Sequence, residues 1–368
     1  MTKAIEVAVP IERVGVAAYT VPTDAAESDG TLEWDSTTIV VVEMDAGGER
    51  GLGYTYSDVA AATLIESKLA PLIEGSDALA VSASWAAMVA AIRNLGRPGL
   101  SSASIAAVDV ALWDLKARLL ELPLATLLGR VHEAVPIYGS GGFTSYDVAQ
   151  LRAQLGAWVA RDIPRVKMKV GRDPADDPAR VRAAREAIGD EAELFVDANG
   201  AYARKEALAL AETFAEEKVS WFEEPVSSDD LDGLRLLRDR APAKMAIAAG
   251  EYGYDLPYFR RMLEAGAVDV LQADVTRCAG ITELLRVGAL CSAHSILLSA
   301  HTAPSIHAHA CCAIEPLAHV EYFHDHVRIE ELLFEGVIAP VEGRLRPDTT
   351  RPGLGLQLKR SDAERYAV

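Results

Sequence analysis

Ionisable residues recur in the second part of the chain at intervals of 20 to 28 residues. Each ends or follows a short apolar run, and the interval is about the length of one strand and helix unit. If the runs are parallel strands of a barrel, their carboxyl ends open onto one face, where such barrels do chemistry. The residues in this register are Lys169, Asp197, Glu223, Glu251, Asp274, His301 and Glu321.

Three of them, Asp197, Glu223 and Glu251, are acids on successive predicted strands. Packed together in a low-dielectric pocket they would repel one another, so we expect a cation among them. Carboxylate oxygens suit a hard ion with positions open for substrate, which favours Mg²⁺ over Zn²⁺, with Mn²⁺ as a substitute. A single acid of this kind could simply make a loop hydrogen bond, but three in register favour the metal.

Lys169 and His301 come from strands on opposite sides of the predicted barrel and would approach this metal from two sides. Asp274, one strand before His301, could hold one imidazole nitrogen and set its tautomer. Lys167 shares a strand face with Lys169, so its charge is expected to lower the pKa of that lysine. A half-exposed strand would instead turn both lysines to water. The ring of ionisable residues favours the inward orientation.

The elements that would position these residues alternate between β-rich and amphipathic helical segments from about residue 134 onward. This alternation predicts parallel βαβ units, and eight such strands favour a closed (β/α) barrel. The predicted strands are 135–140, 166–170, 193–198, 220–225, 244–251, 268–274, 295–301 and 318–324, and helical patterns cover 176–189, 203–217, 229–239 and 279–291.

The first 133 residues predict an α+β capping domain. Segments 4–20 and 36–45 are typical of a hairpin, 51–57 of a third strand, and 104–120 of a helix. Residues 21–35 would join the first two strands as an acidic loop, either a mobile lid or a surface excursion. We expect the barrel to occupy 134–325 and the segment 326–368 to return to the cap.

Composition excludes several classes of function. The net charge is −18, which disfavours nucleic acid as a partner. No apolar window is long enough for a bilayer, and the start lacks a secretory signal, so we expect a cytoplasmic protein without membrane attachment. The four cysteines fit neither a disulfide framework nor a metal site, which predicts reduced core residues.

Two H-x-H pairs, His307 with His309 and His324 with His326, leave a zinc-dependent hydrolase on the same barrel as a remote alternative. Residues i and i+2 of a helix point apart, so the first pair is interpreted as packing or capping. The second pair falls past the last predicted strand.

Several ordered motifs resemble those of the enolase superfamily, specifically its mandelate racemase subgroup, across nearly the whole chain. The muconate-lactonizing relatives would place a lysine on the sixth strand, where this sequence has Asp274 and Arg277. The motifs are ALWDLKARLLELPLATLLG (111–129), KMK (167–169), DANGAY (197–202), FEEP (222–225), GEYGY (250–254), ADVTRCAGIT (273–282) and SAH (299–301).

The resemblance implies a modified (β/α)7β barrel with the α+β cap, and Mg²⁺ on Asp197, Glu223 and Glu251, with Glu223 rather than Glu224 as the ligand of that pair. It also implies roles for the other residues of the ring. Lys169 is implied to be the base on one face, His301 with Asp274 the base or acid on the other, Lys167 the group neutralising the substrate carboxylate, and Glu321 a protonated acid hydrogen-bonded to it.

The implied reaction is removal of the proton α to a carboxylate through a metal-stabilised enediolate. Dehydration of an acid sugar is the favoured outcome. Racemisation, epimerisation or cycloisomerisation of a hydroxy acid or lactone remain open alternatives. The expected partner is a small carboxylate, and the resemblance implies a homo-oligomer. Substrate specificity is expected in the lid, around Tyr54 and Tyr56, and in short loops after the first and seventh barrel strands.

Overall fold

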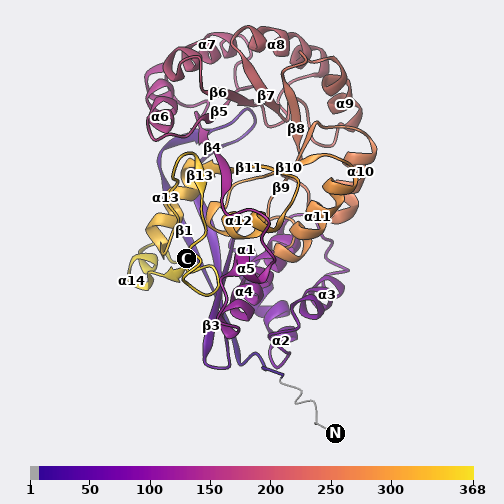
Figure 1. The fold of residues 1–368 in the computed structure, drawn as a ribbon, viewed down its shortest axis with the longest axis vertical. Coiled ribbons are helices and arrows are strands. Elements are labelled where there is room, and N and C mark those ends of the chain that lie inside the picture. Colours follow the sequence, from indigo (N-terminus) through magenta and orange to yellow (C-terminus); the bar gives the residue numbers. More distant parts are fainter. Residues whose placement is uncertain (1–7) are drawn as a thin grey trace.

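The computed structural model describes residues 8–368 and contains a closed parallel barrel joined to an antiparallel cap (Figure 1). Part of the predicted first strand, residues 4–7, lies outside the described residues. Within 8–368, no helix combines the length and the apolar character needed to cross a membrane.

The cap sheet has the order β1-β2-β3, with β1 over Arg13–Ser28, β2 over Glu33–Ala46 and β3 over Glu49–Tyr56. The prediction that 21–35 form a loop is wrong, because β1 and β2 continue through most of it. Their register shifts between Pro22 and Glu27, and the pairing then resumes at the far end. Figure 1 shows this indigo hairpin arm extending from the cap to the barrel.

The tip of the arm is held on the barrel by direct contacts. The Thr144 amide donates to the Ser28 carbonyl over 2.8 Å, and the Thr144 hydroxyl donates to the Asp29 carbonyl over 2.8 Å. A Cβ at Gly30 would lie 2.6 Å from the Ala198 carbonyl oxygen, so only glycine permits this approach. The strand conformation of the arm is thus supported by contacts distant in sequence.

Helices pack on one face of the cap sheet around α4, Leu100–Leu119, which is longer at its start than the predicted helix 104–120. Small residues of β3 explain this packing: a Cβ at Gly53 would lie 2.3 Å from the Ala107 carbonyl oxygen of α4. The other cap helices are α1 (Ala60–Leu64), a π-helical turn (Ile65–Leu69), α2 (Ala70–Ile73), α3 (Val81–Ala91) and α5 (Leu124–Leu127).

The barrel strands run parallel in chain order from β4 to β11, and the pairing of β11 with β4 closes the ring. Continuous apolar runs such as Leu194–Val196 are buried on both faces, as parallel strands require. The predicted strands 244–251 and 295–301 are longer than the observed ones, which cover Ala246–Ala249 and Leu297–Ala300. The strands are β4 (Val135–Gly141), β5 (Arg165–Lys169), β6 (Glu193–Asp197), β7 (Val219–Glu223), β8 (Ala246–Ala249), β9 (Val270–Ala273), β10 (Leu297–Ala300) and β11 (Leu317–Phe323).

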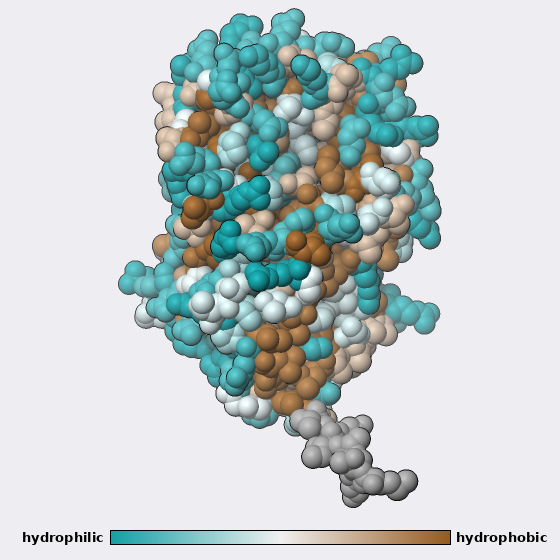
Figure 2. Space-filling model, viewed as in Figure 1, coloured by the Kyte–Doolittle hydropathy of each residue, from teal (hydrophilic) through white to brown (hydrophobic). Residues whose placement is uncertain are grey.

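Helices surround the barrel, and Figure 2 shows a largely hydrophilic surface over this ring. Helix α6 begins with a capping box in which the Asp147 carboxylate accepts from the Gln150 amide over 2.8 Å and the Gln150 side chain accepts in return. The barrel helices are α6 (Val148–Ala160), α7 (Asp177–Ile188), α8 (Arg204–Glu216), α9 (Leu231–Arg240), α10 (Leu256–Glu264), α11 (Ile281–Ala293) and α12 (Pro304–Ala310), followed by a 3-10 turn (Cys311–Ala313).

The C-terminal segment runs along both parts. The Val368 amide donates to the Ala18 carbonyl over 3.2 Å, and the Leu354 amide donates to the buried Asp114 carboxylate over 2.6 Å. The domain boundaries 1–133, 134–325 and 326–368 stay a proposal. The segment contains α13 (His324–Leu333), β12 (Phe334–Glu335), β13 (Arg344–Leu345), β14 (Gln357–Leu358), α14 (Arg360–Ala363) and a 3-10 turn (Glu364–Tyr366).

Candidate active site

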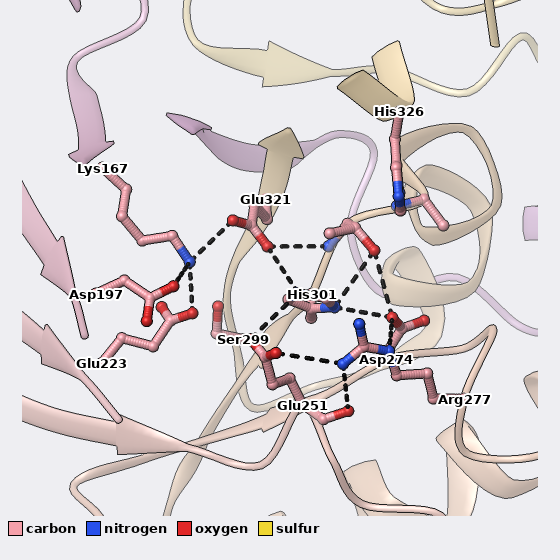
Figure 3. Close-up of polar contacts among 12 residues, drawn as sticks. Lys167, Asp197, Glu223, Glu251, Asp274, Arg277, Ser299, His301, Glu321 and His326 are labelled. Atoms are coloured by element: carbon pink, nitrogen blue, oxygen red, sulfur yellow. Dashed lines mark hydrogen bonds and ion pairs between the residues drawn. The ribbon is translucent and has the colours of Figure 1, made fainter. Parts of the chain in front are cut away.

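The structure brings the predicted ring residues together at the carboxyl ends of the barrel strands, and Figure 3 labels all of them except Lys169. Lys169, Asp197 and Glu223 are the last residues of β5, β6 and β7. The register confirms this alignment, since Asp197 pairs with Lys169 on one side and Glu223 on the other. Glu251, Asp274 and His301 follow β8, β9 and β10, and Glu321 lies within β11. All seven side chains are buried.

The three predicted metal ligands form a compact group of carboxylates. Asp197, Glu223 and Glu251 each offer an oxygen within 4.8 Å of the others. Burial and the neighbouring Asp197 raise the pKa of Glu223 to about 8, as expected for acids crowded in a low-dielectric pocket. Oε2 of Glu251 is buried and makes no hydrogen bond, although His301 Nε2 lies 3.2 Å away.

This donor set fits a divalent cation. It is made entirely of oxygen, and one buried oxygen has no hydrogen-bond partner, which a hard ion would satisfy. The buried acidic triad could therefore bind a metal ion. Glu224, the other acid of its pair, is not part of this group, and burial next to Glu251 raises the pKa of Glu224.

Lys167 lies fully inside the barrel, and its ammonium group contacts three carboxylates. Its ammonium is 2.5 Å from Glu223, 2.8 Å from Glu321 and 3.3 Å from Asp197 (Figure 3). Burial alone would lower the pKa of Lys167, but Glu223 and Glu321 outweigh burial and raise it. The two lysines of β5 thus face the barrel interior and not water.

Lys169 corrects one expectation from the sequence. Burial and Lys167 both lower the pKa of Lys169, as predicted for Lys167, but Asp197 at 2.5 Å, Glu251 and Glu321 together raise it by more. The net shift is upward, because the carboxylate contact is direct. The amide oxygen of Asn199 accepts a second hydrogen bond from Lys169 over 3.1 Å.

His301 is paired with Asp274 as predicted. Nδ1 of His301 lies 2.8 Å from an Asp274 oxygen, and the Thr276 amide and hydroxyl both donate to the other oxygen over 2.7 Å. Burial alone would raise the pKa of Asp274. The hydrogen bond from His301 and the positive charge of His301 instead hold the pKa of Asp274 below its usual range. Nε2 of His301 is left on the side of Glu251 and Glu321.

Glu321 differs from the protonated acid expected from the resemblance. Although burial raises the pKa, Lys167 at 2.8 Å and His301 lower it to about 2. Glu321 is therefore ionised in this arrangement. The protonated state that the resemblance implies for Glu321 concerns the site with a substrate carboxylate bound, and it stays a prediction.

Comparison with known sequences places this geometry in a family. Residues 150–363 match the model "Enolase C-terminal domain-like", and residues 17–129 match "Mandelate racemase / muconate lactonizing enzyme, N-terminal domain". The chain belongs to the mandelate racemase/enolase superfamily. It is therefore an enzyme.

Three proteins illustrate the relationship of this superfamily member to others. A mandelate racemase/muconate lactonizing enzyme-like protein from Rubrobacter xylanophilus is 63% identical, with a TM-score of 0.96 over 98% of this chain and 100% of that one. The 3,6-anhydro-alpha-L-galactonate cycloisomerase of Streptomyces coelicolor is 33% identical over 97% of this chain and 99% of its own. L-talarate/galactarate dehydratase from Salmonella typhimurium, solved with Mg and L-lyxarohydroxamate, is 27% identical, with a TM-score of 0.90 over 100% and 95% of the two chains.

The histidine pairs of this superfamily member do not form a two-histidine site. His307 is buried in α12; its Nε2 accepts from the Val275 amide over 3.0 Å and its Nδ1 donates to the Thr302 carbonyl over 2.7 Å, so its interpretation as a packing residue is confirmed. His326 stacks on Tyr56 with ring centroids 3.4 Å apart. Nε2 of His324 lies 3.0 Å from a carboxylate oxygen of Asp24 in the hairpin arm. Cys278, Cys291, Cys311 and Cys312 are free and buried, as predicted.

A cavity of about 410 Å³ connects the ring of ionisable residues to the cap. Its lining includes Lys169, Glu251, His301 and Glu321, together with residues of the hairpin arm. The expectation that the loop near Tyr54 and Tyr56 lines the pocket holds for Tyr56. Tyr54 is instead fully buried, with its hydroxyl donating to Glu330 over 2.6 Å.

Sequence reasoning missed several residues of this cavity. Asn199, Arg277 and Thr302 each follow a barrel strand, and their position near a strand end is a signal that could have found them. Arg277 lies 3.2 Å from Glu251 and 3.5 Å from Asp274. Trp34 of the arm carried no such signal.

Proposed function

We propose that this enzyme removes the proton α to the carboxylate of a sugar acid and then eliminates the β-hydroxyl as water, giving a 2-keto-3-deoxy acid. The observation that carries the proposal is a lysine and a carboxylate-paired histidine that line one cavity together with Glu251, which belongs to a buried group of three acids. Dehydratases and cycloisomerases of sugar acids among the relatives support the substrate class.

We propose Asp197, Glu223 and Glu251 as ligands of Mg²⁺ or Mn²⁺. When bound, the ion would supply positive charge to the substrate carboxylate and offset the charge of Asp197 that raises the pKa of Lys169. We propose that Lys167, which contacts Glu321 and Glu223, helps neutralise the substrate carboxylate.

In the proposed reaction Lys169, in its neutral form, takes the α-proton, and the electron pair of that C–H bond forms the carbon–carbon double bond. The bond from the β-carbon to its hydroxyl breaks on the other face. His301 donates its Nε2 proton to the departing oxygen, which leaves as water. Asp274 holds the imidazolium through Nδ1 while that proton is available. The resulting enol then becomes the keto acid by gaining a proton at the β-carbon and losing its hydroxyl proton to water.

The energetic requirement explains why a base alone is insufficient. General acid and base catalysis contributes about 10²- to 10⁴-fold, roughly 3 to 5 kcal/mol, whereas enzymes commonly supply about 8 to 23 kcal/mol. Most of the acceleration must come from charges fixed where the negative charge develops. Glu321 would contribute once protonated, because a substrate carboxylate beside it would raise its pKa.

The experiment follows sugar acids by proton NMR in D₂O with Mg²⁺, comparing wild type with Lys169→Ala and His301→Asn. Dehydration predicts loss of the α-proton signal together with a keto product, and both variants should lose product formation. The exposed Lys218→Ala is the matched control and should behave as wild type. Exchange of the α-proton without any keto product would contradict dehydration.

Cycloisomerisation is a second candidate, favoured by the relative that is 33% identical over 97% of this chain. The same two groups would act, with His301 protonating a ring oxygen instead of a hydroxyl. An isomer of unchanged mass in place of a dehydrated product identifies this outcome. Assembly into a homo-oligomer is a separate proposal, tested by light scattering of the purified protein.

A further inference from the structure

The cavity has two ends of different charge. The barrel end carries Lys169, Arg277 and His301 beside the acids of the ring. The cap end is lined by hydroxyl and carboxyl groups, and within the described residues no lysine or arginine of the cap lines it. The polar side chains of the cap end are Asp29, Ser36, Thr37, Thr38, Ser57 and Asp58.

The cations of the barrel end are already paired. Arg277 lies 3.2 Å from Glu251 and 3.5 Å from Asp274, and its guanidinium also covers the Tyr252 ring at 5.1 Å. Lys169 contacts Asp197 at 2.5 Å. The ion pairs therefore hold both Lys169 and Arg277 at the barrel end of the cavity, where the reacting carboxylate would bind.

His326 does not supply a positive charge between the two ends. Its ring stacks on Tyr56 with an interplanar angle of 14°, and burial lowers its pKa to about 3. The imidazole is thus neutral near pH 7. It offers a flat polar surface that suits an uncharged carbohydrate chain.

We infer that the substrate carries a single carboxylate and a neutral polyhydroxyl tail, as in aldonic acids and their anhydro forms, and not a carboxylate at each end. The inference rests on the proposed function, which places the reacting carboxylate at the barrel end. The tail then reaches the cap end, where hydroxyl oxygens can accept hydrogen bonds from sugar hydroxyls, whereas the hydroxyls of Ser36 and Thr37 already donate to Asp35 and Asp325.

The only charged side chains of the described cap residues that a second carboxylate would meet in the cavity are acids, Asp29 and Asp58. Asp29 is buried. Its carboxylate accepts hydrogen bonds from the Thr31 and Leu32 amides over 2.6 and 2.7 Å, which fix its position. Asp58 is held at the start of α1 by the Ala60 amide over 2.8 Å. Neither group can turn away freely, and a carboxylate taken out of water without a cation is strongly disfavoured.

The test uses pairs of sugar acids of identical configuration that differ only in the terminal carbon, a CH₂OH in the aldonate and a carboxylate in the aldarate. Galacto, gluco, manno and altro pairs are each followed with Mg²⁺ by α-deuterium exchange and by product formation. For every pair that reacts, kcat/KM for the aldonate should exceed that for the aldarate by at least 10-fold. An aldarate that reacts as well as its aldonate, or better, overturns the inference while leaving the proposed function intact.

Failure of the proposed function has a different signature. In that case neither member of any pair, including anhydro-aldonates, exchanges its α-proton, and both statements are then refuted. Exchange with the diacids alone refutes only the single-carboxylate inference.

Two substitutions test the cause of the preference. Asp58→Asn keeps the acceptor for the Ala60 amide but removes the charge, and should lower the aldonate-to-aldarate ratio of kcat/KM by at least 3-fold. Ser57→Arg supplies a cation at the cap end and should lower the ratio by at least 10-fold. Asp190→Asn, an exposed acid on a distant loop, is the charge-matched control and should leave the ratio unchanged. Unchanged ratios in both cap variants would contradict the electrostatic explanation.

Discussion

Replacing Lys167 by Met tests the electrostatic design of the site without any assay of activity. Lys167 is fully buried and contacts Glu223 at 2.5 Å, Glu321 at 2.8 Å and Asp197 at 3.3 Å. Removing one partner of a buried ion pair costs about 3 to 5 kcal/mol, because it leaves uncompensated charge. In chelator-treated protein we expect the free energy of unfolding to fall by about that amount.

Mg²⁺ should restore part of this loss. Two of the three contacted carboxylates, Asp197 and Glu223, are the proposed metal ligands, whereas Glu321 is not. If the ion compensates about half of the loss, roughly 2 kcal/mol, reciprocity requires the variant to bind Mg²⁺ about 30-fold more tightly than wild type. Lys167 thus competes with the metal for the same oxygens.

The assay combines denaturant unfolding with and without Mg²⁺ and calorimetric titration of Mg²⁺ into both proteins. Lys169→Met, which contacts only Asp197 among the proposed ligands, should show a smaller effect in the same direction. Lys218→Met removes an exposed ion pair and should change neither quantity. An equal loss of stability with and without Mg²⁺, together with unchanged or weaker binding, would refute the reasoning.

Three further outcomes are expected. Asp274→Asn removes the negative charge that fixes the tautomer of His301 and stabilises its imidazolium, and it should slow product formation about 10²- to 10⁴-fold while α-deuterium exchange by the lysine face persists; loss of both to the same extent in the NMR assay would contradict this assignment. Burial raises the pKa of Glu330 to about 7, so its contribution to stability is complete below its ordinary value of 4.5 and is lost as pH rises through 7. Glu330→Gln should therefore become more stable relative to wild type between pH 5 and 8 in thermal unfolding, and a constant difference across that range would count against it. His307→Ala leaves a buried amide and a buried carbonyl unpaired and should cost about 2 to 6 kcal/mol in denaturant unfolding; a loss below about 1 kcal/mol would show that water replaces the ring.

The positions of the site residues along the chain were predictable because the barrel repeats. One strand and the helix that follows it take about as many residues as separate successive ring residues. Parallel strands also end on the same face of the barrel. Asp197 and Glu223 could therefore be placed side by side from their spacing alone, and their register confirms it. Likewise, alternation along β5 put Lys167 and Lys169 on one face.

The charge states were not predictable in the same way. The pKa of Lys169 rises and that of Glu321 falls because groups of opposite charge from other strands surround each of them, with Asp197 and Lys167 as the direct partners. Coulomb energy depends on the separation of the atoms, which the spacing of residues in the chain does not give.

The hairpin arm shows the same limit for the fold. Residues 21–35 contain glycine, proline and several acids, which by local preference favour a loop. Their strand conformation depends on contacts with residues more than 100 positions away, including Thr144 and Ala198. The sequence by itself determined the barrel and its ring of ionisable residues, because these follow from local periodicity, and its ordered motifs carried the family resemblance. Only the tertiary structure decided which end of the cavity carries cations and which carries hydroxyls, because that division arises where the arm meets the barrel.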